Sequence, residues 1–235
     1  KVNQSGMAEV LETEREALIA LYEATYGDNW TRNDNWCSDK PVSEWYGIYC
    51  NDNGTVCRIE VQNNNLTGEI PESITNLNKL YRLWMQNNNL SGNIPSNIGD
   101  LIDLEEIFLN NNSIEGPIPE SITNLTKLRQ LWLFENDLSG TIPENIGNLV
   151  NLNELLLGRN KLNGSIPESI TNLGLLHYLD LQANNLSGEI PVNIDKLINL
   201  KSLCLNYNNI SGTIPNSITN LSKLRQLWLH GNNLS

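Results

Sequence analysis

Apolar residues recur along most of this chain with a fixed period. Leu66, Leu90 and Ile114 begin a series with 24-residue spacing, and the series runs to Leu234 without an insertion. Each period reads L-x-x-L-x-L-x-x-N-x-L-S-G-x-I-P-x-x-I-x-x-L-x-x. A constant period of about 20 to 50 residues is typical of repeat proteins, in which each unit buries its apolar face against its neighbours. The pattern predicts a solenoid of seven full units, residues 56–223, and a partial eighth.

Each unit should contain one short strand of a parallel stack. Leu83 and Met85 alternate with more polar or aromatic neighbours, the pattern of a strand with one buried face. Asn88 recurs at the same place in every unit and can satisfy backbone groups where the chain turns. Gly92 and Pro95 then bring the chain round, and the apolar spacing that follows suits a short helical turn. These turns alternate between Ser-Ile-Thr-Asn-Leu and Asn-Ile-Gly or Asn-Ile-Asp, with a 48-residue period.

Residues 1–55 lack the repeat and are predicted to form an N-terminal cap. Thr13 and Glu16 have capping-box spacing, Leu18 and Leu21 lie on one apolar stripe, and Gly27 is placed to end the helix. Such a helix can lie across the first repeat. We therefore expect a cap over residues 1–55 and a solenoid over residues 56–235.

The repeats resemble the plant-specific class of extracellular leucine-rich repeats, as in receptor-kinase ectodomains and polygalacturonase-inhibiting proteins. The resemblance rests on the motif L-T/S-G-x-I-P, present as LSGNIP at residues 90–95, and covers residues 56–235. Residues 14–50, with Trp30, Trp36 and Trp45, look like the cap of such proteins. The resemblance implies an α/β, right-handed solenoid with a parallel β-sheet on the concave face. It also implies short 3₁₀ and second-strand elements on the convex face and a helical N-terminal cap.

The charge of the chain excludes two classes of partner. The net charge is -12, whereas nucleic-acid backbones and anionic membrane surfaces attract clustered Lys and Arg. No apolar run approaches the roughly 18 to 20 residues of a membrane helix, so we expect no membrane insertion by this segment. The chain stops just past a predicted strand, and an uncapped solenoid exposes its core. We therefore expect a partner or further repeats to cover the C-terminal end.

The cysteines and glycosylation sequons predict a secreted or extracellular protein. Cys37, Cys50 and Cys57 cluster in a tryptophan-rich segment, which favours a local disulfide in an oxidising compartment. A bridge between Cys37 and Cys50 would stabilise the fold by about 3 kcal/mol, with Cys57 as a competing partner. Several N-x-S/T sequons occur. The candidate glycosylation sites are Asn29, Asn124 and Asn220.

The sequence offers no recognisable catalytic chemistry. His177 and His230 lie two repeats apart in different columns, without metal-ligand spacing, and no glycine-rich phosphate loop occurs. We therefore predict neither enzymatic activity nor a cofactor or metal.

The outward positions of the strands are the predicted binding surface, because the scaffold does not need particular residues there. Parallel strands lie about 4.8 Å apart, so Trp84, Phe108 and Trp132 should form a contiguous aromatic ladder. Aromatic residues and arginine are enriched at binding hot spots. The concave positions hold six basic and six acidic residues, a balance that suits a protein or peptide better than a polyanion. The candidate ligand-binding residues are Tyr81, Arg82, Trp84, Gln86, Phe108, Arg129, Trp132, Phe134, Arg159, Tyr178, Asp180, Tyr207, Arg225, Trp228 and His230.

The leading functional hypothesis is a recognition module, either a receptor ectodomain or a secreted inhibitor, that binds a protein or peptide on its concave face. Resemblance to polygalacturonase inhibitors adds a cell-wall hydrolase as a partner. A competing interpretation is that the rings stack only to stabilise the sheet. Glycan or cell-wall binding by the aromatic ladder is the alternative function. A regular surface for cell wall or ice is disfavoured, because the concave columns are too varied.

Overall fold

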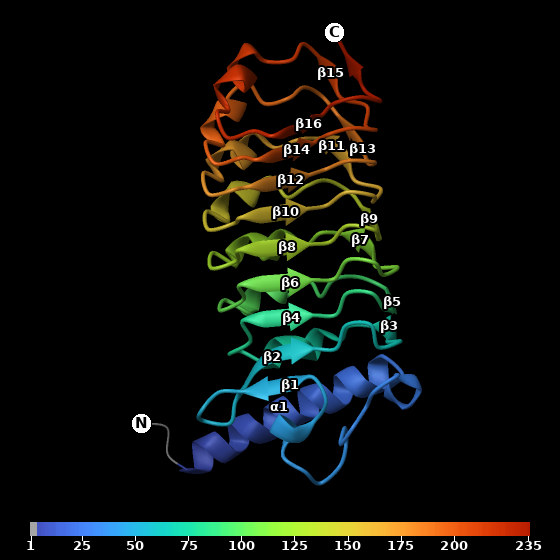
Figure 1. Ribbon diagram of the computed structural model, residues 1–235. Helices are drawn as coiled ribbons and strands as arrows, with labels where there is room; N and C mark the ends of the chain where they lie inside the picture. Colours follow the sequence, from blue (N-terminus) through green and yellow to red (C-terminus); the bar gives the residue numbers. More distant parts are fainter. Residues whose placement is uncertain (1–3) are drawn as a thin grey trace.

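Nine short strands form one sheet along the length of the molecule (Figure 1). The computed structural model describes residues 4–235. Strand β1 runs antiparallel to β2, and every later neighbour is parallel with a register step of one repeat. The strands of the sheet, in order, are β1 (Ile48–Cys50), β2 (Val56–Glu60), β4 (Arg82–Trp84), β6 (Glu106–Phe108), β8 (Gln130–Trp132), β10 (Glu154–Leu156), β12 (Tyr178–Asp180), β14 (Ser202–Cys204) and β16 (Gln226–Trp228).

The opposite side of the solenoid is built from 3₁₀ turns and second strands, as predicted. The second strands pair two by two, β3 with β5, β7 with β9, β11 with β13 and β15 with β17. They are β3 (Thr67–Glu69), β5 (Asn89–Ser91), β7 (Glu115–Pro117), β9 (Asp137–Ser139), β11 (Asn163–Ser165), β13 (Asn185–Ser187), β15 (Ser211–Gly212) and β17 (Asn233–Leu234). The 3₁₀ turns of the repeats are Glu72–Asn76, Ile98–Asp100, Glu120–Asn124, Ile146–Asn148, Glu168–Asn172, Ile194–Lys196 and Asn216–Asn220. The predicted fold class is confirmed.

The core is one continuous column between the sheet and the 3₁₀ turns. Inward strand residues such as Leu83 and Met85 are buried, as are Ile98 and Leu101 of the facing turn. The same positions are buried in successive repeats because the period never changes. None of the described helices is long and apolar enough to cross a membrane.

A ladder of buried and partly buried asparagines joins each repeat to the one before it. The side-chain oxygen of Asn160 accepts a hydrogen bond from the Leu138 N–H at 3.0 Å, and its amide donates to the carbonyl oxygens of Leu133 and Leu157 at 3.0 and 3.1 Å. Leu133 and Leu138 belong to the preceding repeat and Leu157 to the same one. Equivalent bonds recur at Asn88, Asn112, Asn136, Asn184, Asn208 and Asn232.

The cap helix is longer than predicted. Helix α1 (Gln4–Ala24) begins nine residues before Thr13, so the prediction that Thr13 caps the helix is wrong. The Thr13 hydroxyl instead donates to the Glu9 carbonyl oxygen inside the helix at 3.0 Å. Leu11 lies seven residues before Leu18, so the apolar stripe continues upstream of Thr13. Ala24 ends the helix three residues before Gly27.

A buried carboxylate attaches this helix to the first repeat. Glu14 is buried, and its carboxylate accepts a hydrogen bond from the Val56 N–H of β2 at 2.9 Å. Burial raises the pKa of Glu14, against the lowering effect of the bond from Val56. No periodic signal along the chain predicts this contact, because it joins two segments 42 residues apart.

The predicted Cys37–Cys50 bridge is absent, because the four cysteines are free. Cys37 is exposed in a turn with left-handed backbone (φ 59°), where the charges of Glu23 and Arg15 of α1 act on it. Cys50 ends β1 near Cys57, and burial raises the pKa of the Cys50 thiol to about 11. The two residues therefore lie in different surroundings, which spacing along the chain did not reveal.

Two of the three turns of the Asn-Ile-Gly or Asn-Ile-Asp type use their glycine for a close approach to the next turn, and the third has Asp195 there. A Cβ atom on Gly147 would lie 2.2 Å from the Ser169 carbonyl oxygen of the next turn. The Ser169 hydroxyl accepts from the Gly147 N–H at 3.1 Å and donates to the Glu144 carbonyl oxygen at 2.7 Å. Gly99 and Ser121 repeat this close approach two repeats earlier. A glycine turn thus closes against the serine turn that follows it.

We expect Asn160→Ala to lower the free energy of unfolding by about 2 to 3 kcal/mol, because the buried Leu138 N–H and two carbonyl groups lose their partner. Urea denaturation measures the change. Asn209→Ala is the matched control, because Asn209 is exposed and its side chain has no hydrogen bond within residues 4–235; its effect should stay below about 0.5 kcal/mol. Equal losses in both variants would contradict the role of the ladder.

Gly147→Ala should destabilise the protein by about 2 kcal/mol, because the added methyl group forces the neighbouring turn away. Gly174→Ala provides the control, since a Cβ there meets nothing within 4 Å. Thermal melts of both variants measure the difference. A neutral Gly147→Ala would show that the two turns do not need their close approach.

Candidate ligand-binding face

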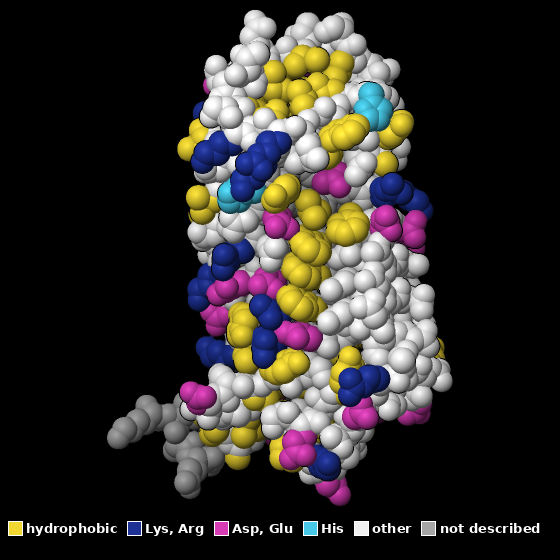
Figure 2. Space-filling view, in the orientation of Figure 1, with side chains coloured by type: hydrophobic (Ala, Val, Ile, Leu, Met, Phe, Trp, Pro, Cys, Tyr) yellow, Lys and Arg dark blue, Asp and Glu magenta, His cyan; other side chains and the backbone are white. Residues whose placement is uncertain are grey.

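Side chains that alternate with the buried strand residues form the outer face of the nine-stranded sheet, called the sheet face below. They fall into rows that cross the strands at 24-residue steps, and one of these rows holds Arg82, Glu106, Glu154 and Tyr178. The central row is Glu60, Trp84, Phe108, Trp132, Leu156, Asp180, Cys204 and Trp228, and an entry row lies just before the strands: Tyr81, Glu105, Arg129, Asn153, His177, Lys201 and Arg225. The exit row follows them: Gln86, Asn110, Phe134, Gly158, Gln182, Asn206 and His230. Figure 2 shows an apolar stripe on this face, with charged side chains gathered mainly along one side of it.

Three rings of the central row stack face to face. The ring centroids of Trp84 and Phe108 lie 5.1 Å apart at 12°, and those of Phe108 and Trp132 lie 4.0 Å apart at 13°. This spacing follows from the strand register, which pairs the three residues directly. Phe108 is only 6% exposed, so the prediction that its ring is openly available to a ligand is wrong. The neighbouring rings cover it, and the stack presents mainly its edges to solvent.

Acidic residues one strand further on hold the two indoles. The Trp84 indole N–H donates to a carboxylate oxygen of Glu106 at 3.0 Å, and that of Trp132 donates to Glu154 at 2.8 Å. The Arg82 guanidinium covers the outer face of Trp84, with its carbon 4.4 Å from the ring centroid. Glu106 and Glu154 were not among the predicted site residues. The constant 22-residue offset between each tryptophan and its glutamate was the available signal.

Charges near the N-terminal end of the face neutralise one another. Arg82 forms ion pairs with Glu60 at 3.1 Å and with Glu106 at 2.9 Å. Arg58 pairs with Glu60 at 3.3 Å. All four side chains are more than two-thirds buried, which gives this part of the face a fixed arrangement before any ligand arrives.

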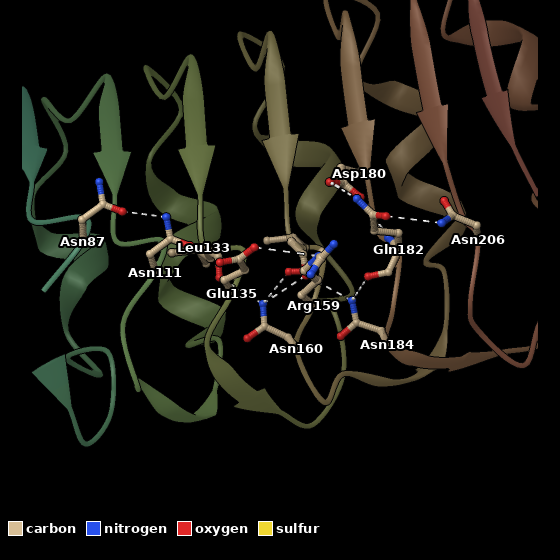
Figure 3. Close-up of polar contacts among 12 residues, drawn as sticks. Asn87, Asn111, Leu133, Glu135, Arg159, Asn160, Asp180, Gln182, Asn184 and Asn206 are labelled. Atoms are coloured by element: carbon tan, nitrogen blue, oxygen red, sulfur yellow. Dashed lines mark hydrogen bonds and ion pairs between the residues drawn. The ribbon is translucent and has the colours of Figure 1, made fainter. Parts of the chain in front are cut away.

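Polar contacts link the exit row and its neighbours (Figure 3). Asp180 accepts two hydrogen bonds from Gln182, from the backbone N–H at 3.0 Å and from the side-chain amide at 3.1 Å. Burial raises the pKa of Asp180, and the bonds from Gln182 oppose the rise. Gly158 leaves room for this carboxylate, because a Cβ there would lie 2.8 Å from an Asp180 oxygen. Arg159 pairs with Glu135 at 3.8 Å.

Aromatic residues near the C-terminal end of the face are open to solvent. Tyr178 is 42% exposed, Trp228 48% and Tyr207 59%. His230 packs edge-on against Tyr207 at 4.9 Å and against Trp228 at 5.9 Å. An open pocket of about 270 Å³ is lined by Gln182, Cys204, Asn206, Trp228 and His230. Tyr178 and Tyr207 therefore offer free aromatic surface, whereas the stack offers edges.

The remaining predicted sites lie at accessible positions. Arg129 and Arg225 are exposed. Asn29, Asn124 and Asn220 are also exposed, and their glycosylation stays a prediction. Within residues 4–235, no group of three His, Cys, Asp or Glu side chains could hold a metal ion.

Comparison with known families identifies the repeats. The Leucine Rich Repeat family matches residues 56–77, 79–101, 103–125, 127–149, 151–173, 175–197 and 199–221. The chain belongs to the leucine-rich-repeat family. No curated protein matches the sequence.

Solved structures with similar folds include plant receptors. The leucine-rich-repeat chain of a complex of PEPR1 with AtPEP1 has a TM-score of 0.88 and 30% identity, over 95% of this chain and 32% of that one. The ectodomain of the Arabidopsis receptor kinase HAESA, in complex with an IDA peptide hormone ligand, has a TM-score of 0.75 and 26% identity. The match covers 96% of this chain and 42% of that one. A plant ice-binding protein has a TM-score of 0.75 and 28% identity, and the match covers 95% of this chain and 87% of that one. The chain thus spans less than half the length of either receptor structure.

Phe108→Ala should lower the free energy of unfolding by about 3 kcal/mol, because it removes the ring that separates Trp84 from Trp132. Tyr207→Ala is the control and should cost less than about 1 kcal/mol, since Tyr207 is exposed. Urea denaturation gives the stability, and near-ultraviolet circular dichroism reports the stack. An unchanged aromatic signal in Phe108→Ala would contradict the stacked arrangement.

Proposed function

We propose that this protein is an extracellular recognition module that binds a protein or peptide on the sheet face. The supporting observation is the fixed aromatic row, in which carboxylates on neighbouring strands hold Trp84 and Trp132 in place. Large aromatic side chains held in one conformation supply contact area with little loss of conformational entropy on binding. The exposed Tyr178 and Trp228 extend this surface toward the C-terminal end.

The similarity to receptor ectodomains favours a peptide as the ligand. HAESA is described with a peptide hormone, and its ectodomain has the same strand and turn architecture. The same face would serve a receptor ectodomain or a secreted inhibitor of a cell-wall hydrolase. Both roles require an extracellular location, which is part of the proposal.

The geometry weighs against the alternative of glycan binding. A sugar stacks on the flat face of an aromatic ring, but Phe108 is covered on both sides and Arg82 covers the outer face of Trp84. An ice-binding surface is also disfavoured, because the central row mixes acidic, aromatic, aliphatic and thiol side chains instead of repeating one type.

The test uses two substitutions that add the same charge on different faces. Leu156→Arg places a long cation in the middle of the sheet face, whereas Val150→Arg places it beside a 3₁₀ turn, where Val150 is exposed. Each protein is used to select binders from a displayed library of random twelve-residue peptides and to retain proteins from extracellular fluid. Peptides selected by the wild type should bind Val150→Arg equally well and Leu156→Arg at least about tenfold more weakly.

Thermal melts of the two variants must show comparable folding. Selection of the same ligands by all three proteins would place the binding site elsewhere. The glycan alternative would be favoured by two results together. The wild type would select no peptide or protein, and it would bind oligosaccharides in a way that is lost in Trp132→Ala and kept in Arg129→Ala.

A further inference from the structure

The entry row changes character halfway along the solenoid. Its early members include Tyr81 and Glu105, but from residue 129 onward it contains no acidic residue. Four basic side chains of this second half form what we call the basic row: Arg129, His177, Lys201 and Arg225. Figure 2 shows basic side chains gathered along one margin of the sheet over its later strands.

The three permanent cations of the basic row have no side-chain partner within the part of the chain that the structure describes. Arg58, Arg82 and Arg159 on the same face each form an ion pair with a glutamate. Among residues 4–235, by contrast, the side chains of the three cations of the basic row make no ion pair or hydrogen bond. Glu154, on the strand next to β8, is bound to the Trp132 indole instead. The basic row is therefore free to bind an external anion.

Folding does not account for this arrangement. Like charges on adjacent repeats repel one another, so stability alone would favour acidic residues between the cations of the row. The chain has many acidic residues, with a net charge of -12, but they lie elsewhere. At physiological salt the Debye length is about 8 Å, so acidic residues on the far side of the solenoid scarcely weaken a local anion site. An acidic ligand can bind here although the whole protein is acidic.

The length of the row sets the size of the ligand segment. Arg129 and Arg225 are four repeats apart, which corresponds to about 19 Å at about 4.8 Å per strand. An extended peptide advances about 3.3 Å per residue, so about six residues span this distance. Beside the row, Tyr178 is exposed, and Gln226 offers amide groups. These neighbours can contact a peptide backbone and apolar side chains, which favours a peptide over a uniform anionic polysaccharide.

We propose that the basic row binds an acidic segment of about six residues within the peptide ligand. This inference rests on the proposed function of the sheet face and specifies the chemistry of the ligand. The segment lies across the starts of strands β8 to β16, with its carboxylates directed toward the row.

The experiment repeats the selection from the random peptide library on two double variants of equal net charge. Lys201→Gln with Arg225→Gln removes two cations from the row, and Lys40→Gln with Lys196→Gln removes two exposed cations elsewhere. Peptides selected by the wild type and by the control should be enriched about threefold or more in Asp and Glu, and the row variant should lose this enrichment. A selected acidic peptide should bind the row variant about tenfold or more weakly, and the control within about twofold.

A version of that peptide with Gln for Glu and Asn for Asp should bind the wild type and the row variant alike. Selected peptides that depend on Leu156 but show no acidic enrichment would overturn this inference and leave the proposed function intact. Absence of any peptide that depends on Leu156 would overturn both. Binding of oligogalacturonate through the row, without selection of acidic peptides, would assign the row to an anionic polysaccharide and overturn the peptide assignment.

Discussion

One asparagine per repeat, hydrogen-bonded to the backbone of two neighbouring repeats, sets the conditions for the rest of this structure. Its amide group satisfies backbone groups of its own repeat and of the preceding one at a turn that is closed to water. The same contact recurs at every repeat, and the series runs without an insertion. Constant length fixes the strand register, and the register brings Trp84, Phe108 and Trp132 into one stack.

The repeats were predictable because the information that specifies them is local and recurs. Alternation around Leu83 indicated the strand and its buried face, and the prediction of second strands and short helical turns is confirmed. The cap was less predictable, because its contacts join segments without periodicity. The carboxylate of Glu14 on Val56 and the left-handed backbone at Cys37 depend on how the whole cap packs. Spacing alone therefore misplaced the start of helix α1 and predicted a bridge that is absent.

The candidate residues could be placed on the sheet face from the sequence, but their relations to one another could not. The period of two assigned Phe108 to the outer face, whereas the orientation of the rings, which covers it, depends on side-chain torsions and on neighbouring carboxylates. The charge sum of the face was also misleading. The face has equal numbers of basic and acidic residues, but those around Arg82 form ion pairs, whereas the cations of the row that ends at Arg225 do not. Only the positions of the side chains reveal this difference.

The close approach of Gly147 to Ser169 has a consequence for how such a protein can grow. The turns at Gly99 and Gly147 each lie close against the serine turn that follows, and Ser217 makes the same backbone contact after Asp195. The turns of the far side therefore recur in pairs of repeats, whereas the strands of the sheet recur in single repeats. Duplication or loss of such a pair keeps every glycine turn next to a serine turn. Gain or loss of a single repeat would bring two turns of the same kind together. Gain or loss of repeats in even numbers would keep this alternation of turns intact.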